Sequence, residues 1–175
     1  MKIKEMLPTM VTMGNIMCGF FAILCVSSQR LEIAAWLIVA AMALDAFDGR
    51  LARMMKSTSM IGAQLDSMAD LVTFGIAPAM LMIKTCTNFP VVFLWSVGLF
   101  FMICAALRLA RFNVQKDESV NMPRHFFTGL PTTLSGGTIA QLVILNHFVQ
   151  IRYGSNMVLM LLPFITFALG LFMVS

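Results

Sequence analysis

The sequence has few charged residues and no paired cysteines. Only 11% of its 175 residues are charged, against about 25% in an ordinary soluble domain, and 59% are hydrophobic. A chain this short cannot bury so much apolar surface in one core, which excludes a soluble globular domain, a disordered chain and a nucleic-acid binder. The four cysteines stand singly without any Cys-x-x-Cys, which argues against a zinc site or a disulfide framework. The composition therefore indicates a membrane protein.

Long apolar runs make up most of the chain. A helix needs about 20 apolar residues to cross a bilayer, and four runs without Asp, Glu, Lys or Arg are long enough: 6–29, 85–107, 126–151 and 153–175. Two shorter runs flank a segment that holds four aspartates, and we interpret each as half of a helix, over 33–56 and 59–83. We therefore predict an all-α integral membrane protein with six transmembrane helices in a single domain, residues 1–175.

The basic residues predict the orientation of these helices. Six spans put both termini on one side, which carries nine of the 12 Lys and Arg residues. The positive-inside rule then makes the termini and the 113–125 loop cytoplasmic, in a multi-pass protein of the cell membrane. Lys2 and Lys4 precede the first apolar run as in a signal peptide, but no Ala-x-Ala follows, so we expect an uncleaved first helix. His147 is expected near the outer interface in a structural role.

Half of the eight acidic residues lie between the two shorter apolar runs. Asp45 and Asp48 are three residues apart and Asp66 and Asp70 are four apart, so each pair shares one helix face. At a rise of about 1.5 Å per residue, the two pairs lie at similar depths on antiparallel helices joined by a turn near Ser57. We expect the four carboxylates to converge on one cavity in the inner half of the membrane.

Acidic residues at this depth are unfavourable, because inserting each into the membrane costs about 2.5–3.5 kcal/mol on insertion scales, and this cost indicates a function. Pairing with Arg50 and Arg53 is the structural alternative, but two arginines cannot neutralise four carboxylates. Oxygen ligands suit Mg²⁺, Mn²⁺ or Ca²⁺, and four carboxylates can hold two ions that assist a phosphoryl displacement. Gly49 and Gly62 would let a ligand approach closely, although helix packing is the alternative for them.

The acidic segment reads Asp-x-x-Asp-Gly-x-x-Ala-Arg, then eight residues, then Gly-x-x-x-Asp-x-x-x-Asp, from Asp45 to Asp70. This pattern resembles the signature of the CDP-alcohol phosphotransferase family, and the six-span layout resembles that family along the whole chain. Further segments resemble its bacterial membrane phosphatidylserine synthases: 12–19, 65–78, 107–113 and 127–131. That subgroup usually has a second proline where Thr133 stands here.

The resemblance implies a reaction in which CDP-diacylglycerol and L-serine give phosphatidylserine and CMP. It implies two divalent ions, Mg²⁺ or Mn²⁺, on the four aspartates, with Asp70 also the general base for the serine hydroxyl. Gly49 and Ala52 would make room for the cytidine, and Arg53 and Asn15 would contact the diphosphate. The full set implied to bind CDP-diacylglycerol is Thr12, Asn15, Gly49, Ala52, Arg53 and Gly62. The family also implies a homodimer, and no nucleic-acid partner is expected.

The carboxylate of serine needs a cationic partner. Arg108 and Arg111 lie three residues apart at the cytoplasmic end of the fourth predicted helix, and Asn113 follows them. The planar fork of a guanidinium suits a carboxylate. Positive-inside anchoring is the alternative role for these arginines, and the subgroup resemblance favours a serine site made by Arg108, Arg111 and Asn113.

Three other functions fit parts of the pattern. A phosphatidylglycerophosphate synthase would use the same site with a different acceptor alcohol. A cation transporter would distribute its acids across the bilayer, whereas these cluster in one half. A prenyltransferase also has aspartate-rich metal motifs, but the continuous pattern from Asp45 to Asp70 argues against it.

Overall fold

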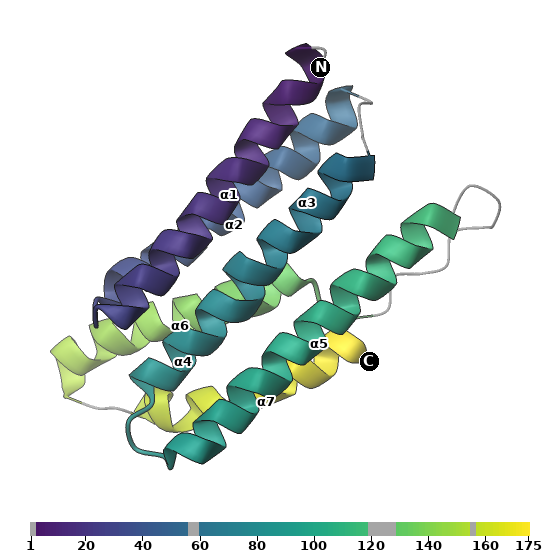
Figure 1. The fold of residues 1–175 in the computed structure, drawn as a ribbon. Helices are drawn as coiled ribbons and strands as arrows, with labels where there is room; N and C mark the ends of the chain where they lie inside the picture. Colours follow the sequence, from purple (N-terminus) through teal and green to yellow (C-terminus); the bar gives the residue numbers. More distant parts are fainter. Residues whose placement is uncertain (1–2, 56–59, 119–128, 155–156) are drawn as a thin grey trace.

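The computed structural model describes residues 3–55, 60–118, 129–154 and 157–175, and within these ranges all regular structure is helical (Figure 1). The described residues form six rod-like helical segments. Five are single helices: α1 (Ile3–Ser27), α2 (Leu31–Met55), α5 (Val91–Glu118), α6 (Thr132–Tyr153) and α7 (Met157–Val174). The remaining rod is continuous but composite, with α3 (Met60–Asp70), a π-helical turn η1 (Leu71–Ile76) and α4 (Ala77–Thr85). This confirms the predicted all-α class.

Three helices in the described part of the chain are long and apolar enough to cross a membrane: Gln64–Thr85, Val91–Val114 and Thr132–Arg152. Two shorter apolar helices, Thr12–Ser27 and Val158–Val174, accompany them. The remaining helix is α2, which carries two of the four predicted acids, Asp45 and Asp48, in its second half. The bundle is therefore the membrane type that the apolar runs predicted.

One boundary differs from the sequence prediction. The apolar run 85–107 stops just before Arg108, and we expected Arg108 and Arg111 at the cytoplasmic end of the helix that contains this run. The helix continues to Glu118, so both arginines lie within α5. Arg and Leu are strong helix formers, and charge ends an apolar run without ending a helix.

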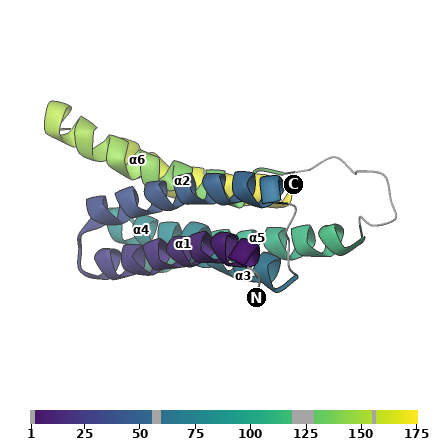
Figure 2. The ribbon, with the colours of Figure 1, turned by 90° about the horizontal axis from the view of Figure 1, so that it is seen from above.

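The composite rod occupies the centre of the bundle. It contacts α1, α5 and α6, while α2 lies between α1 and α6, as Figure 2 shows, and α7 packs along α5. Its buried core residues include Phe74, Leu81 and Met82. Large apolar side chains such as Trp36 and Trp95 are instead exposed on the outside, as expected for helices that face lipid.

Two glycines let neighbouring helices approach the π-helical turn. Pro78 has no N–H to bond the Phe74 carbonyl four residues earlier, and Gly136 of α6 lies against that carbonyl, where a Cβ would come within 2.5 Å of the oxygen. A Cβ on Gly19 of α1 would come within 2.9 Å of Thr73 Cα. Small residues permit such close contacts between membrane helices. Helices α1 and α6 therefore both pack closely against η1, the turn that follows Asp70.

Helix α6 begins where the sequence departs from the resembled subgroup. Pro131 is its N-cap and Thr132 its first residue, so Thr133 lies in the first turn. The first N–H groups of a helix have no partner within the helix. Threonine or proline therefore fits at this position, and the departure does not disturb the start of α6.

Candidate active site

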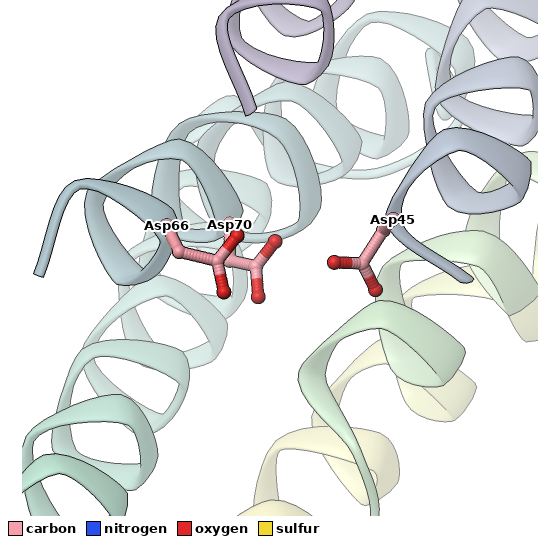
Figure 3. A group of neighbouring side chains, drawn as sticks. All are labelled: Asp45, Asp66 and Asp70. Atoms are coloured by element: carbon pink, nitrogen blue, oxygen red, sulfur yellow. The ribbon is translucent and has the colours of Figure 1, made fainter. Parts of the chain in front are cut away.

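Three of the four predicted carboxylates meet in the structure. Asp45 comes from α2 and Asp66 and Asp70 from α3, and their side chains lie together in Figure 3. Each offers one oxygen, and these oxygens all lie within 4.8 Å of one another. All three residues are half-buried. The spacing of four residues between Asp66 and Asp70 puts both on one face of α3.

The cluster has the donor chemistry of a site for a divalent cation. Carboxylate oxygens are the ligands that hard cations such as Mg²⁺, Mn²⁺ and Ca²⁺ prefer. Like charges this close repel strongly in a partly dry environment, and a bound cation would offset that repulsion. The three described carboxylates therefore fit the metal dependence that the sequence pattern implied.

Asn15 of α1 supports the cluster from a third helix. It is 1% exposed, its Nδ2 donates to Asp70 Oδ1 at 3.2 Å, and its backbone oxygen accepts from Thr73 Oγ1 at 3.1 Å. The Asn15 Oδ1 is buried without a hydrogen-bond partner among the described residues. A buried amide oxygen of this kind calls for a donor or a cation. Asn15 thus orients Asp70 and presents an acceptor beside it.

Two of the predicted serine-binding residues are tied to helices around the cluster. Arg108 is half-buried on α5, and its Nη1 donates to Thr132 Oγ1 at 2.9 Å. Its positive charge also interacts electrostatically with the Asp70 carboxylate. Asn113 Oδ1 accepts from Ser67 Oγ at 3.0 Å, and Ser67 directly follows Asp66 on α3. Arg108 and Asn113 therefore belong to the surroundings of the acids.

Arg111 has a different contact. Its side chain is exposed, and Nη1 donates to the Val174 carbonyl at 3.3 Å. The last carbonyls of a helix lack partners within the helix, and cations are favourable there. Arg111 therefore caps the end of α7 in this structure.

The remaining predicted residues divide into two groups. Thr12 is buried on α1, one turn before Asn15, and Gly62 is half-buried on α3, one turn before Asp66. The other group lies on α2 after Phe47, where the side chains are outside the described part of the structure: Asp48, Gly49, Ala52 and Arg53. The expected turn near Ser57 and the Arg53 contact with the diphosphate also lie outside it.

Hydroxyl residues that bridge helices were missed at the level of sequence. Thr132 binds Arg108, Ser67 binds Asn113, and Thr73 binds the backbone of Asn15. The sequence signal that could have identified them is their position: Thr132 directly follows Pro131, and Ser67 and Thr73 lie within three residues of a site aspartate. Other hydroxyls, such as that of Thr138, bond a carbonyl of their own helix, so residue type alone does not separate the two groups.

The chain belongs to the CDP-alcohol phosphatidyltransferase family, whose pattern it matches over residues 5–172. That match covers the whole acidic segment and reaches from α1 to α7, short of only the first two residues of α1 and the last two of α7.

Three similar proteins bear the name CDP-diacylglycerol–serine O-phosphatidyltransferase. The one from Helicobacter pylori (strain J99) is 35% identical over 96% of this chain and 69% of its own length. The Bacillus subtilis protein is 37% identical over 74% of this chain and 71% of its own length. The Saccharomyces cerevisiae protein is 39% identical over 71% of this chain and 49% of its own length.

Proposed function

We propose that this protein transfers the phosphatidyl group of CDP-diacylglycerol to the hydroxyl of L-serine, which gives phosphatidylserine and CMP. The observation that carries the proposal is the meeting of Asp45, Asp66 and Asp70, with oxygens within 4.8 Å, in a chain of this family. The names of similar proteins from bacteria and yeast support serine as the acceptor.

The chemistry divides between the carboxylates and the substrates. Asp45, Asp48, Asp66 and Asp70 would hold two divalent ions, Mg²⁺ or Mn²⁺, which when bound supply positive charge for the diphosphate and the departing CMP. Asp70 accepts the proton of the serine hydroxyl. The serine oxygen bonds to the phosphorus that carries diacylglycerol, and the bond from that phosphorus to the oxygen of CMP breaks. The hydrogen bond from Asn15 supports Asp70 in this role because it fixes one carboxylate oxygen.

The CDP-diacylglycerol side of the site uses small and polar residues. Thr12 and Asn15 share a buried face of α1, and Gly62 precedes Asp66 by one turn. We assign substrate binding to these three and to Gly49, Ala52 and Arg53 of α2, where small residues would leave space for the cytidine.

The serine side is formed by α5. Arg108 is assigned to the serine carboxylate, since it lies half-buried on α5 and its charge interacts electrostatically with Asp70. Asn113 and Arg111 complete this side. The contact of Arg111 with Val174 uses only one N–H of a group with several.

We further infer the wider organisation of the enzyme. Residues 1–175 would form one six-span domain of the cell membrane, with cytoplasmic termini that follow from the excess of basic residues on that side. The active site would open to cytosolic serine, and two copies of the chain would form a homodimer.

The test is a CMP-release assay on membranes that contain the protein. CDP-diacylglycerol is supplied with serine or with glycerol 3-phosphate, and the lipid product is analysed. Serine-dependent release of CMP with formation of phosphatidylserine is expected. Release that depends on glycerol 3-phosphate instead would assign the chain to the phosphatidylglycerophosphate synthases of the same family.

A further inference from the structure

The first residue of α6 makes a contact that the proposed reaction does not yet explain. Thr132 is 2% exposed, and its hydroxyl oxygen accepts from Arg108 Nη1 at 2.9 Å. A threonine at a helix start often bonds the N–H groups of its own first turn. Here Pro131 is the N-cap and its carbonyl accepts the Ser135 N–H at 3.0 Å. The Thr132 hydroxyl instead reaches across to α5.

The chemistry of this partner matters for Arg108. A guanidinium that is partly buried needs hydrogen-bond acceptors, because a polar group out of water is costly when unpaired. A carboxylate acceptor brings a negative charge with it, whereas a hydroxyl is a neutral acceptor. The Thr132 hydroxyl therefore orients the Arg108 guanidinium without adding negative charge of its own.

The backbone before Thr132 is anchored, so the hydroxyl is a fixed reference point. The Leu130 N–H donates to the Phe172 carbonyl of α7 at 3.0 Å. Gly129 has φ +118°, and a Cβ there would come within 2.9 Å of the Met173 oxygen. Both contacts use the end of α7, to which Arg111 of α5 also donates. Helices α5, α6 and α7 therefore meet at the point where Thr132 holds Arg108.

We propose that Thr132 is a positioning residue for acceptor recognition: its hydroxyl aims the Arg108 guanidinium at the carboxylate of serine. This inference rests on the proposed function and goes beyond it, because it concerns the choice of acceptor and not the phosphoryl transfer itself. It requires that loss of the hydroxyl weakens serine binding while CDP-diacylglycerol binding persists.

The test compares three single variants of the full chain in membranes. Thr132→Val keeps the shape and removes the acceptor, Thr132→Ser keeps the acceptor, and Thr138→Val removes a hydroxyl that only bonds Leu134 O of its own helix. Thr132→Val should raise the KM for serine about tenfold, the effect of losing one hydrogen bond to a charged group. The KM for CDP-diacylglycerol should hardly change. Thr132→Ser and Thr138→Val should behave like the wild type.

A second readout separates positioning from packing. Serinol lacks the carboxylate of serine, so the preference for serine over serinol, as a ratio of kcat/KM, should fall in Thr132→Val and be retained in Thr132→Ser. If Thr132→Val does not accumulate in membranes, Thr132→Ala carries the same comparison.

Two results would overturn the proposal. One is a serine KM and a serine preference that stay at the wild-type values in Thr132→Val. The other is equal impairment of Thr132→Val and Thr132→Ser, which would mean that packing matters and the hydroxyl does not. Failure of the proposed function is distinct, because it would appear in the wild type as CMP release that does not depend on serine.

Discussion

Helix α2 carries acidic residues in its first turn and in its second half, and these two groups have opposite kinds of neighbour. Glu32, in the first turn, contacts the imidazole of His147 on α6, and both side chains are about half exposed, at 50% and 44%. Asp45, farther along, meets Asp66 and Asp70 of α3. One acid is matched with a base of a neighbouring helix, and the other is gathered with more acids.

The difference shows where counter-charge must come from outside the chain. A half-exposed pair such as Glu32 and His147 contributes about 0–1 kcal/mol and needs no ligand to explain it. Three carboxylates in one cluster repel each other, and their retention inside a membrane protein points to function. The location of His147 on α6, paired with Glu32, agrees with the structural role expected for it.

Of the changes that test this difference, removal of divalent metal should have the largest effect on activity. Chelation with EDTA is expected to abolish CMP release, because the carboxylates would be left without the ions that balance them. Addition of Mg²⁺ or Mn²⁺ should restore it. Undiminished turnover in thoroughly chelated membranes would remove the metal from the proposed reaction.

The next largest loss of activity is expected for Asp70→Asn. The amide keeps the size of the side chain and one oxygen but cannot accept the serine proton, and loss of a general base costs roughly 10²–10⁴ in rate. CDP-diacylglycerol affinity should suffer less than turnover. Glu32→Gln makes the same chemical change at the paired acid and is the matched control. Near-normal turnover of Asp70→Asn would exclude it as the base.

Arg108→Lys should have a smaller, selective effect. Lysine keeps the charge and loses the planar fork, so the KM for serine should rise about tenfold with little change for CDP-diacylglycerol. Arg111→Lys should raise the KM for serine less than Arg108→Lys does, because part of the Arg111 guanidinium is engaged by the Val174 carbonyl at the end of α7. A serine KM unchanged in both variants would make these arginines topological anchors.

Glu32→Gln should have the smallest effect. The contact with His147 is half exposed, so the free energy of unfolding should change by less than about 1 kcal/mol, and activity should stay near the wild-type value. Thermal unfolding in detergent and the CMP assay measure the two quantities. A loss of activity comparable to that of Asp70→Asn would contradict the distinction between the paired acid Glu32 and the clustered acids.

The sequence predicted what depends on local spacing. Apolar runs located the rods, with α2 found at Leu31–Met55 against a predicted 33–56, and spacings of three and four residues put acids on shared helix faces. These inferences need only the helical period and the thickness of a bilayer.

The side-chain contacts between helices could not be predicted from local spacing. Thr132 and Thr138 have the same side chain on the same helix, yet one bonds Arg108 and the other its own helix. Which of them crosses to α5 depends on how α5 and α6 pack, and no local spacing encodes that. The continuation of α5 past Arg111 was missed for a related reason, because hydropathy marks where an apolar run ends and not where a helix does.

The most direct test of the central claim is a Mn²⁺ titration of the purified protein, followed by the electron paramagnetic resonance signal of the free ion. Saturable loss of that signal is expected with the wild type and with Glu32→Gln, and much weaker loss with Asp45→Asn or Asp66→Asn. Equal Mn²⁺ binding by all four proteins would contradict the claim that the carboxylates of α2 and α3 form a metal site.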